Sequence, residues 1–217
     1  MGEHGVFEQA YFDTYFPDHD RKNPAHKLAH YRSILDRFAI PAEGPARVLD
    51  LGCAYGSFAA SLDPSWTVCG TDVSEFAIAK ARARVPHAMF AVMRDHRIPY
   101  DARFDAVSAW DVLEHIPDLD DIAEQVRAHL AAQGVFAFAV PVYDGPLGWL
   151  VDRLDRDVTH VHRLPRRRWL EWAARHFALV EWWGAFRLLL PGGYYIHWPS
   201  RALRAVSPAL IAVARVE

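Results

Sequence analysis

Residues 48–58 read Val-Leu-Asp-Leu-Gly-Cys-Ala-Tyr-Gly-Ser-Phe, an apolar run that breaks at a glycine. The run 47–51 predicts a short buried strand, and residues 57–62 after the turn predict a helix. Gly52 permits a sharp turn, and Gly56 lets the backbone approach a ligand without a Cβ in the way. A strand, a glycine turn and a helix predict the start of a parallel α/β unit.

The same alternation continues towards the C-terminus and predicts a Rossmann-like, doubly wound α/β fold. Upstream of it, apolar positions at helical spacing predict two helices. The expected helices are 7–16, 25–38, 75–84, 119–130 and 165–176, with a short one from Ser200; the expected strands are 47–51, 67–71, 88–93, 106–109, 134–140, 178–186 and 210–216. The last two strands lack a full crossover helix between them. We therefore expect a mostly parallel seven-stranded sheet with an antiparallel edge strand.

Composition narrows the class of protein. A chain of 217 residues with 52% apolar and 24% charged residues fits one globular domain. The net charge of -3 gives no basic field for a nucleic-acid backbone. No run approaches the roughly 20 apolar residues that span a bilayer, and the cysteines, Cys53 and Cys69, suit neither a disulfide framework nor a zinc site. We expect a cytoplasmic protein without nucleic-acid or membrane partners, and the Ala- and Arg-rich composition indicates a bacterium.

The region after the second strand indicates a nucleoside ligand. Asp72 follows Gly52 by twenty positions, where a carboxylate can accept hydrogen bonds from both hydroxyls of a ribose. A dinucleotide-binding G-x-G-x-x-G loop is absent, because Ala54 stands where the second glycine should be. Asp50 would oppose a pyrophosphate but suits an ammonium group. A ligand with adenosine at one end and an amino acid at the other fits both facts.

Residues 48–58, Asp72 and the stretch 104–116 resemble class I S-adenosylmethionine-dependent methyltransferases over roughly residues 47–140. The resemblance implies that S-adenosylmethionine is the cofactor and S-adenosylhomocysteine the product. It also implies an N-terminal helical cap over 1–44 and a cofactor-binding region over 45–217, for which we expect substrate-facing insertions at 141–164 and 187–200.

The resemblance further implies the cofactor contacts. Asp50 and Gly52 would line the methionine end, Asp72 would hold the ribose, and Trp110 and Asp111 would face the transferring methyl group. The family commonly has an acid after the third strand that binds adenine; here Arg94 aligns with it, and we choose the neighbouring Asp95. The predicted cofactor-binding residues are Asp50, Gly52, Cys53, Ala54, Gly56, Asp72, Val73, Arg94, Asp95, Trp110 and Asp111.

Methyl transfer is an in-line displacement, so a base is needed only where the acceptor must lose a proton. His160, in a polar loop, and His115, after the fourth strand, are the predicted catalytic bases, with a structural role as the alternative for both. The predicted substrate-binding residues are Tyr11, Tyr15, Trp149, Tyr194 and Tyr195, although the N-terminal aromatic residues also have the spacing of core residues.

Two further charged features are interpreted as non-catalytic. The histidine and acid neighbours at 18–20 and 95–96 predict no metal site, because adjacent residues rarely converge on one ion. The arginines at 163 and 166–168 could reach an anionic substrate, but a solvated helix start explains them better.

Two other functions stay open. A nicotinamide-dependent oxidoreductase is disfavoured by Ala54 and Asp50, whereas a catalytically silent methyltransferase-like binding subunit would keep the same pocket. The acceptor is expected to be a small biosynthetic metabolite or sugar, methylated on oxygen, nitrogen or carbon, because fold does not specify substrate. A homodimer is neither indicated nor excluded.

Overall fold

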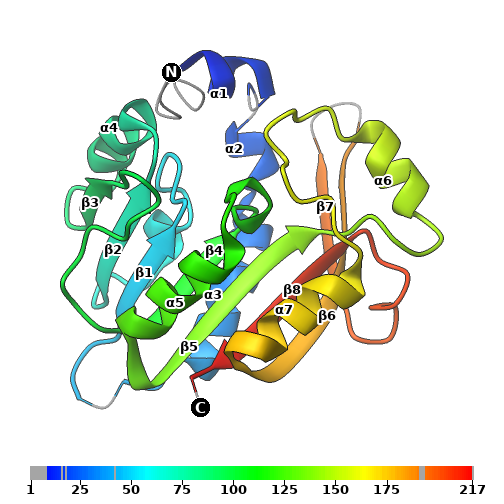
Figure 1. Cartoon of the computed structure of the whole chain (residues 1–217). Coiled ribbons are helices and arrows are strands. Elements are labelled where there is room, and N and C mark those ends of the chain that lie inside the picture. The colour runs from blue at the N-terminus through cyan, green and yellow to red at the C-terminus, as the bar shows by residue number, and fades with distance from the viewer. Residues whose placement is uncertain (1–8, 16, 18, 42, 191–193, 217) are drawn as a thin grey trace.

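The computed structural model describes residues 9–15, 17, 19–41, 43–190 and 194–216 (Figure 1). The described residues form one eight-stranded mixed sheet in the order β3-β2-β1-β4-β5-β8-β6-β7. The first five strands pair in parallel, and the last three pair antiparallel. The strands are β1 (Arg47–Leu51), β2 (Thr67–Asp72), β3 (Met89–Val92), β4 (Phe104–Trp110), β5 (Leu130–Pro141), β6 (Ala178–Leu189), β7 (Tyr195–Ser200) and β8 (Ala209–Arg215).

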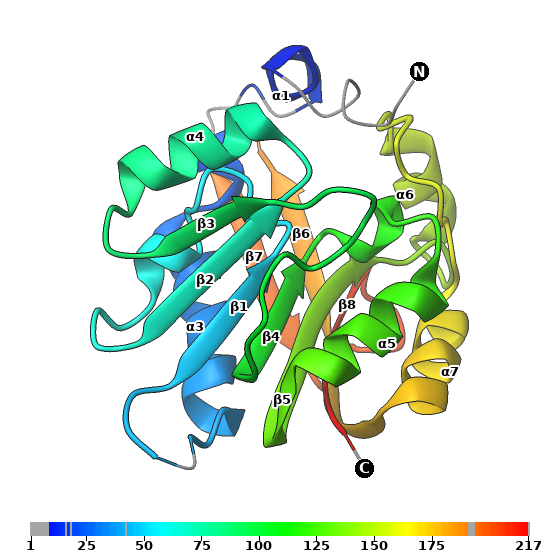
Figure 2. The same cartoon turned by 60° about the vertical axis from the view of Figure 1, so that its left-hand side comes forward.

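Helices cover both faces of the sheet, so that it has one apolar core on each side. Figure 2 shows α5 in front of the strands and α3 behind them, and α7 packs beside α5. The described helices are α1 (Gln9–Tyr15), α2 (His19–Lys22), α3 (Ala25–Phe38), α4 (Glu75–Arg84), α5 (Leu119–His129), α6 (Gly148–Leu154) and α7 (Arg166–His176), with 3₁₀ turns η2 (Ala59–Ser61) and η3 (Leu113–His115). None of them is long and apolar enough to cross a membrane.

The helix α3 forms as its sequence predicts. Its apolar residues Tyr31, Ile34, Leu35 and Phe38 recur at intervals of three and four, and all are buried against the sheet. The chain before it, α1 and α2, passes over the upper edge of the sheet in Figure 1, beyond the carboxyl ends of β1 and β4. This edge is where an open α/β sheet binds its ligands.

The antiparallel part of the sheet is larger than predicted. The predicted pairing of the last two expected strands is confirmed, since β6 pairs with β8 antiparallel. The segment 187–200, predicted as an insertion, instead extends β6 and contributes β7, with Leu189 paired to Tyr195. The eighth strand was missed because 195–200 mixes apolar and polar residues and contains Pro199, which disfavours a central strand but is tolerated at the sheet edge.

Three local predictions are wrong. The helix expected at 57–62 is only the 3₁₀ turn η2, because Pro64 follows closely and disfavours helical backbone in the residue before it. The helix expected from Ser200 is a run of turns up to Val206. The segment 141–164, expected to be irregular, contains α6.

Candidate active site

The turn after β1 brings backbone close to the ligand-binding edge. Gly52 has a φ of +69°, and a Cβ built on it would lie 2.3 Å from Val112 Cγ2. Ala54 (φ 44°) and Gly56 (φ +71°) also lie in the left-handed region. The Gly52 N–H donates to Thr71 O at 2.7 Å, which draws the turn towards the end of β2. A larger residue at 52 would push the turn away from η3.

Two carboxylates flank this turn. Asp50, at 2% exposure, accepts a hydrogen bond from Ser108 Oγ at 2.9 Å, and burial raises the pKa of Asp50 to about 7. Asp72, at the end of β2, accepts from the backbone N–H groups of Ala54 (2.9 Å) and Ser74 (3.0 Å). Each carboxylate oxygen has two lone pairs, so these bonds leave Asp72 able to accept from a ligand as well.

A cavity of about 430 Å³ opens between this turn, the N-terminal helices and η3. Its volume lies in the range of small-molecule sites. The predicted cofactor residues that line it are Asp50, Gly52, Cys53, Ala54, Asp72, Val73, Trp110 and Asp111. Gly56, Arg94 and Asp95 are not among its described lining residues.

After β3, the cavity wall is formed by Met93 and His96. Arg94 points instead to Glu75 Oε1, at 2.7 Å on the surface. Asp95 and His96 both have positive φ, at 49° and 53°. The tight turn therefore places His96, one residue beyond the predicted acid, against the cavity.

The opposite end of the cavity is basic. Lys27 Nζ lies 3.5 Å from Asp111 Oδ2, and Arg187 donates to Asp111 Oδ1. Asp111 has a φ of 60°, which is unusual for a residue that is not glycine and typical of functional sites. Although burial opposes it, Arg187 and Lys27 lower the pKa of Asp111 to about 2. Burial lowers the pKa of Lys27 to about 8.

An aromatic stack also lines the cavity. Trp110 lies parallel to Tyr31 of α3, with ring centroids 4.0 Å apart and an interplanar angle of 6°. Phe58 packs edge-on against Trp110 at 5.5 Å. All three rings line the cavity and give it an aromatic wall.

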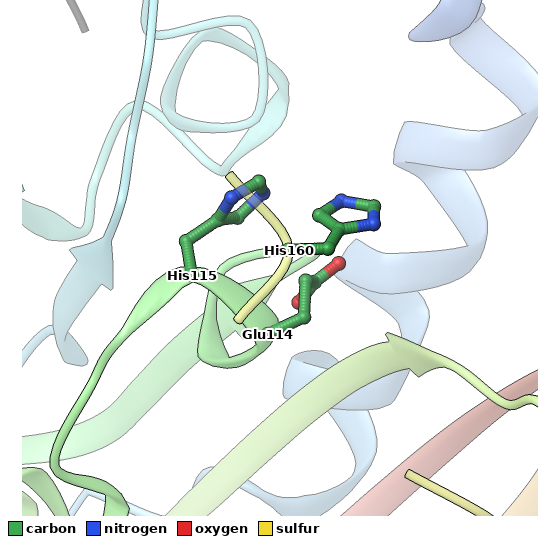
Figure 3. A group of neighbouring side chains, drawn as sticks. All are labelled: Glu114, His115 and His160. Atoms are coloured by element: carbon green, nitrogen blue, oxygen red, sulfur yellow. The ribbon is translucent and has the colours of Figure 1, made fainter. Parts of the chain in front are cut away.

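Glu114, His115 and His160 form a compact cluster in the same cavity (Figure 3). Each residue offers one ligand atom, and these atoms lie within 4.8 Å of one another. Burial raises the pKa of Glu114 well above its usual value and, together with the neighbouring His160, lowers the pKa of His115 to about 4. The two predicted bases thus meet, although 45 positions separate them in the sequence.

The loop that carries His160 is attached to η3 by backbone hydrogen bonds. The N–H groups of Val161 and His162 donate to Glu114 O at 2.9 and 3.1 Å. Asp155 Oδ2 lies 2.6 Å from His160 Nδ1. Despite its burial, the hydrogen bonds from Tyr143 and His160 keep the pKa of Asp155 below its ordinary value.

The predicted substrate-binding residues separate into two groups. Tyr11 and Tyr195 line the cavity. Trp149 and Tyr194 are 68% and 65% exposed and are not among its described lining residues. The side chain of Tyr15 lies outside the described part of the structure.

The sequence reasoning missed Lys27, Tyr31, Glu114 and Arg187 as cavity residues. Lys27 could have been noticed, because it occupies the apolar face of α3, four positions before Tyr31. A lysine on a buried helix face requires a partner or a ligand. Arg187 carries no comparable local pattern, since its partner Asp111 is 76 positions away.

Parallel strands in the order 3-2-1-4-5, with a glycine turn after the first and an acid after the second, are the architecture of class I S-adenosylmethionine-dependent methyltransferases. The model of the methyltransferase domain family matches residues 19–187, and the chain belongs to this family.

Curated relatives match about half of the chain. A trans-aconitate 2-methyltransferase of Variovorax paradoxus is 36% identical over 106 residues, 47% of this chain and 41% of that protein. A malonyl-[acyl-carrier protein] O-methyltransferase of Bacillus anthracis is 28% identical over 123 residues, 54% of this chain and 45% of that protein. The chain therefore aligns with less than half the length of these two relatives.

The fold similarity extends over nearly the whole chain. A Thermotoga maritima protein described as a possible histamine N-methyltransferase superposes with a TM-score of 0.67 at 13% identity. The match covers 95% of this chain and 98% of that one. At this identity the likeness concerns the fold and not the acceptor.

Proposed function

We propose that this protein transfers the methyl group of S-adenosylmethionine to a carboxylate oxygen of a small organic acid. The observation that carries the proposal is the division of charge in the cavity. Asp50 and Asp72 lie on the neighbouring strands β1 and β2, while Lys27 and Arg187 both contact Asp111, which follows β4 on the other side of β1. An acidic end suits a cationic donor, and a basic end suits an anionic acceptor.

The residues of the first end fit S-adenosylmethionine. Asp50 is a buried acid with one described hydrogen bond, and an ammonium group beside it would restore its charged form. The Gly52 turn lines the cavity and packs against Val112 with no room for a Cβ, and Asp72 stands where a ribose would bind. When bound, the cofactor supplies an electrophilic methyl group on a sulfonium. Trp110, which lines the cavity, would help to hold it.

The residues of the second end would bind and orient the acceptor. Lys27 and Arg187 together exceed the charge of Asp111 by one, which leaves a net attraction for a carboxylate. The mostly buried positions of both cations strengthen that attraction relative to a surface site. A carboxylate is already ionised at neutral pH, so it needs orientation and not a base.

The relatives support this acceptor class. The acceptors in their printed names, trans-aconitate and malonyl-[acyl-carrier protein], both contain a carboxylic acid. The predicted bases His115 and His160 line the same cavity, but an ionised carboxylate has no proton for them to remove.

Calorimetric titration with S-adenosylmethionine and S-adenosylhomocysteine tests the cofactor, with NAD as the control. We expect both to bind the wild type and Asp72→Asn to weaken them by about ten- to a hundredfold, from the loss of a charged hydrogen bond or two. Binding of NAD instead, or of none of these, would overturn the cofactor assignment.

A panel of organic acids, each paired with its amide, then tests the acceptor. We expect transfer of the labelled methyl group to acids and not to their amides. Turnover of the amides or of uncharged alcohols would refute the carboxylate proposal. Binding of cofactor without turnover of any acceptor would favour a silent binding subunit.

A further inference from the structure

The Glu114, His115 and His160 cluster is not explained by methylation of a carboxylate, because that reaction needs no base. Glu114 is 1% exposed, and its Oε2 has no hydrogen-bond partner among the described residues. Leaving a buried polar atom unsatisfied costs about 1–3 kcal/mol. A group that binds Glu114 would remove this cost.

Neighbouring side chains fix the protonation of both imidazole rings. Asp155 Oδ2 lies 2.6 Å from His160 Nδ1, so that this nitrogen is the donor. Thr159 Oγ1 donates to Asp157 Oδ1 at 2.5 Å and therefore accepts from His115 Nδ1 at 2.8 Å. Both rings then carry their lone pair on Nε2. Hydrogen bonds of this kind, made by the ring nitrogen that does not bind the ion, are typical of histidines that ligate metal ions.

We propose that Glu114, His115 and His160 bind one divalent first-row transition-metal ion, such as Zn²⁺ or Mn²⁺. The ligands are one carboxylate oxygen and the Nε2 atoms of the two rings, a donor set that such ions accept. One nitrogen of each ring and one Glu114 oxygen lie within 4.8 Å of one another, and ligands about 2.1 Å from one ion stand roughly 3–3.5 Å apart. Side-chain rotations that move the ligand atoms by roughly 1–2 Å would close that difference.

Three protein ligands leave coordination positions open towards the cavity that all three residues line. An oxygen of the acceptor would occupy one of these positions, while Lys27 and Arg187 hold the remainder of its negative charge. This role of the ion rests on the proposed function. The binding of the ion does not, because it depends only on the three side chains.

Titration of the chelator-treated, untagged full chain with ZnCl₂ or MnCl₂ alone tests the site. Calorimetry should give one ion per chain, and CoCl₂ should give visible absorption bands of a nitrogen- and oxygen-ligated ion. Glu114→Gln, which keeps the shape of the side chain, and His160→Gln should each weaken binding at least tenfold. Asp155→Asn should weaken it less, through the orientation of His160.

His162→Gln is the matched control. His162 lies in the same loop, but its Nε2 contacts Ile116 O, at 2.9 Å, outside the cluster. The His162→Gln protein should bind the ion with the affinity of the wild type. Circular dichroism and retained S-adenosylmethionine binding would show that each variant is folded. The proposal would be overturned if the ion showed no saturable binding to the wild type. It would also be overturned if Glu114→Gln and His160→Gln both bound the ion with the affinity of the wild type. Ion binding without cofactor binding would refute the proposed function alone.

Discussion

In the proposed function, the buried carboxyl group of Asp50 would couple cofactor binding to pH. Burial raises the pKa of Asp50 to about 7, so the ligand-free protein holds a proton there at lower pH. An ammonium ligand pairs only with the ionised form, and binding must displace that proton. The dissociation constant of S-adenosylmethionine should therefore rise below pH 7, approaching tenfold per pH unit, and be flat just above it.

Calorimetry between pH 5.5 and 8, in buffers of different ionisation enthalpy, measures both the affinity and the released proton. Asp50→Asn should bind weakly at every pH and show no slope. A wild-type affinity that is constant from pH 5.5 to 8 would contradict this assignment of Asp50.

Lys27 imposes the opposite dependence at the other end of the cavity. Its pKa is lowered to about 8 by burial, so its charge is present below pH 8 and lost above it. The KM of an organic-acid acceptor should rise above pH 8, whereas kcat changes less. Lys27→Met should raise KM by about ten- to a hundredfold at pH 7, from the loss of a charged hydrogen bond, and remove the rise.

Lys80→Met provides the control for Lys27, because Lys80 is exposed on α4. It should leave the KM and its pH profile unchanged. A Lys27→Met enzyme that keeps the wild-type profile would show that another group binds the acceptor.

The turn between β1 and η2 determines the shape of the cofactor end. Gly52→Ala introduces left-handed strain of about 1–2 kcal/mol and a clash with Val112. We expect urea denaturation to show a loss of about 3 kcal/mol in the free energy of unfolding. Gly44→Ala has a similar φ, +68°, but no neighbour within 4 Å of the new Cβ, and should lose only the strain.

The contribution of Val112 can be isolated with a second background. In a Val112→Ala protein, Gly52→Ala should lower the free energy of unfolding by roughly as much as Gly44→Ala does in the wild type. A loss as large as in the wild-type background would mean that the clash does not determine the requirement for glycine at 52.

Elements that depend on local sequence were predictable, and those that depend on distant partners were not. The β1 turn and Asp72 lie within 25 residues and follow from spacing, and α3 follows from its apolar repeat. The position of β8 between β5 and β6 and the pairing of Arg187 with Asp111 depend on residues far apart in sequence, whereas β7 pairs with its neighbour β6 and was missed because of its own mixed sequence. The cluster of Glu114, His115 and His160 also depends on distant residues, because His160 lies 45 positions after His115. Inspection of neighbouring histidines and acids in the sequence therefore did not predict it.

At the scale of the whole molecule, α1 and α2 line the cavity at the edge of the sheet. Tyr11 and Phe12 of α1 pack with Ala77 of α4 in a small apolar cluster, separate from the two main cores. Tyr11 OH donates to Asp157 Oδ2 at 2.9 Å and links α1 to the loop that carries His160. The cluster is small, so α1 should open more readily than the rest of the molecule.

Tyr11→Phe keeps the apolar contacts and removes this hydrogen bond between α1 and the loop that carries His160. A hydrogen bond to a charged group contributes about 1.5–3 kcal/mol, so S-adenosylhomocysteine should dissociate about ten- to a hundredfold faster, while the global free energy of unfolding changes little. Stopped-flow dissociation and amide hydrogen exchange of α1 measure the two effects. Thr14→Ala removes a hydroxyl that donates to Ala10 O within α1, and it should leave the dissociation rate unchanged. If both variants release the product at the wild-type rate, α1 does not control exit from the cavity, and release depends on the loops after β4 and β5.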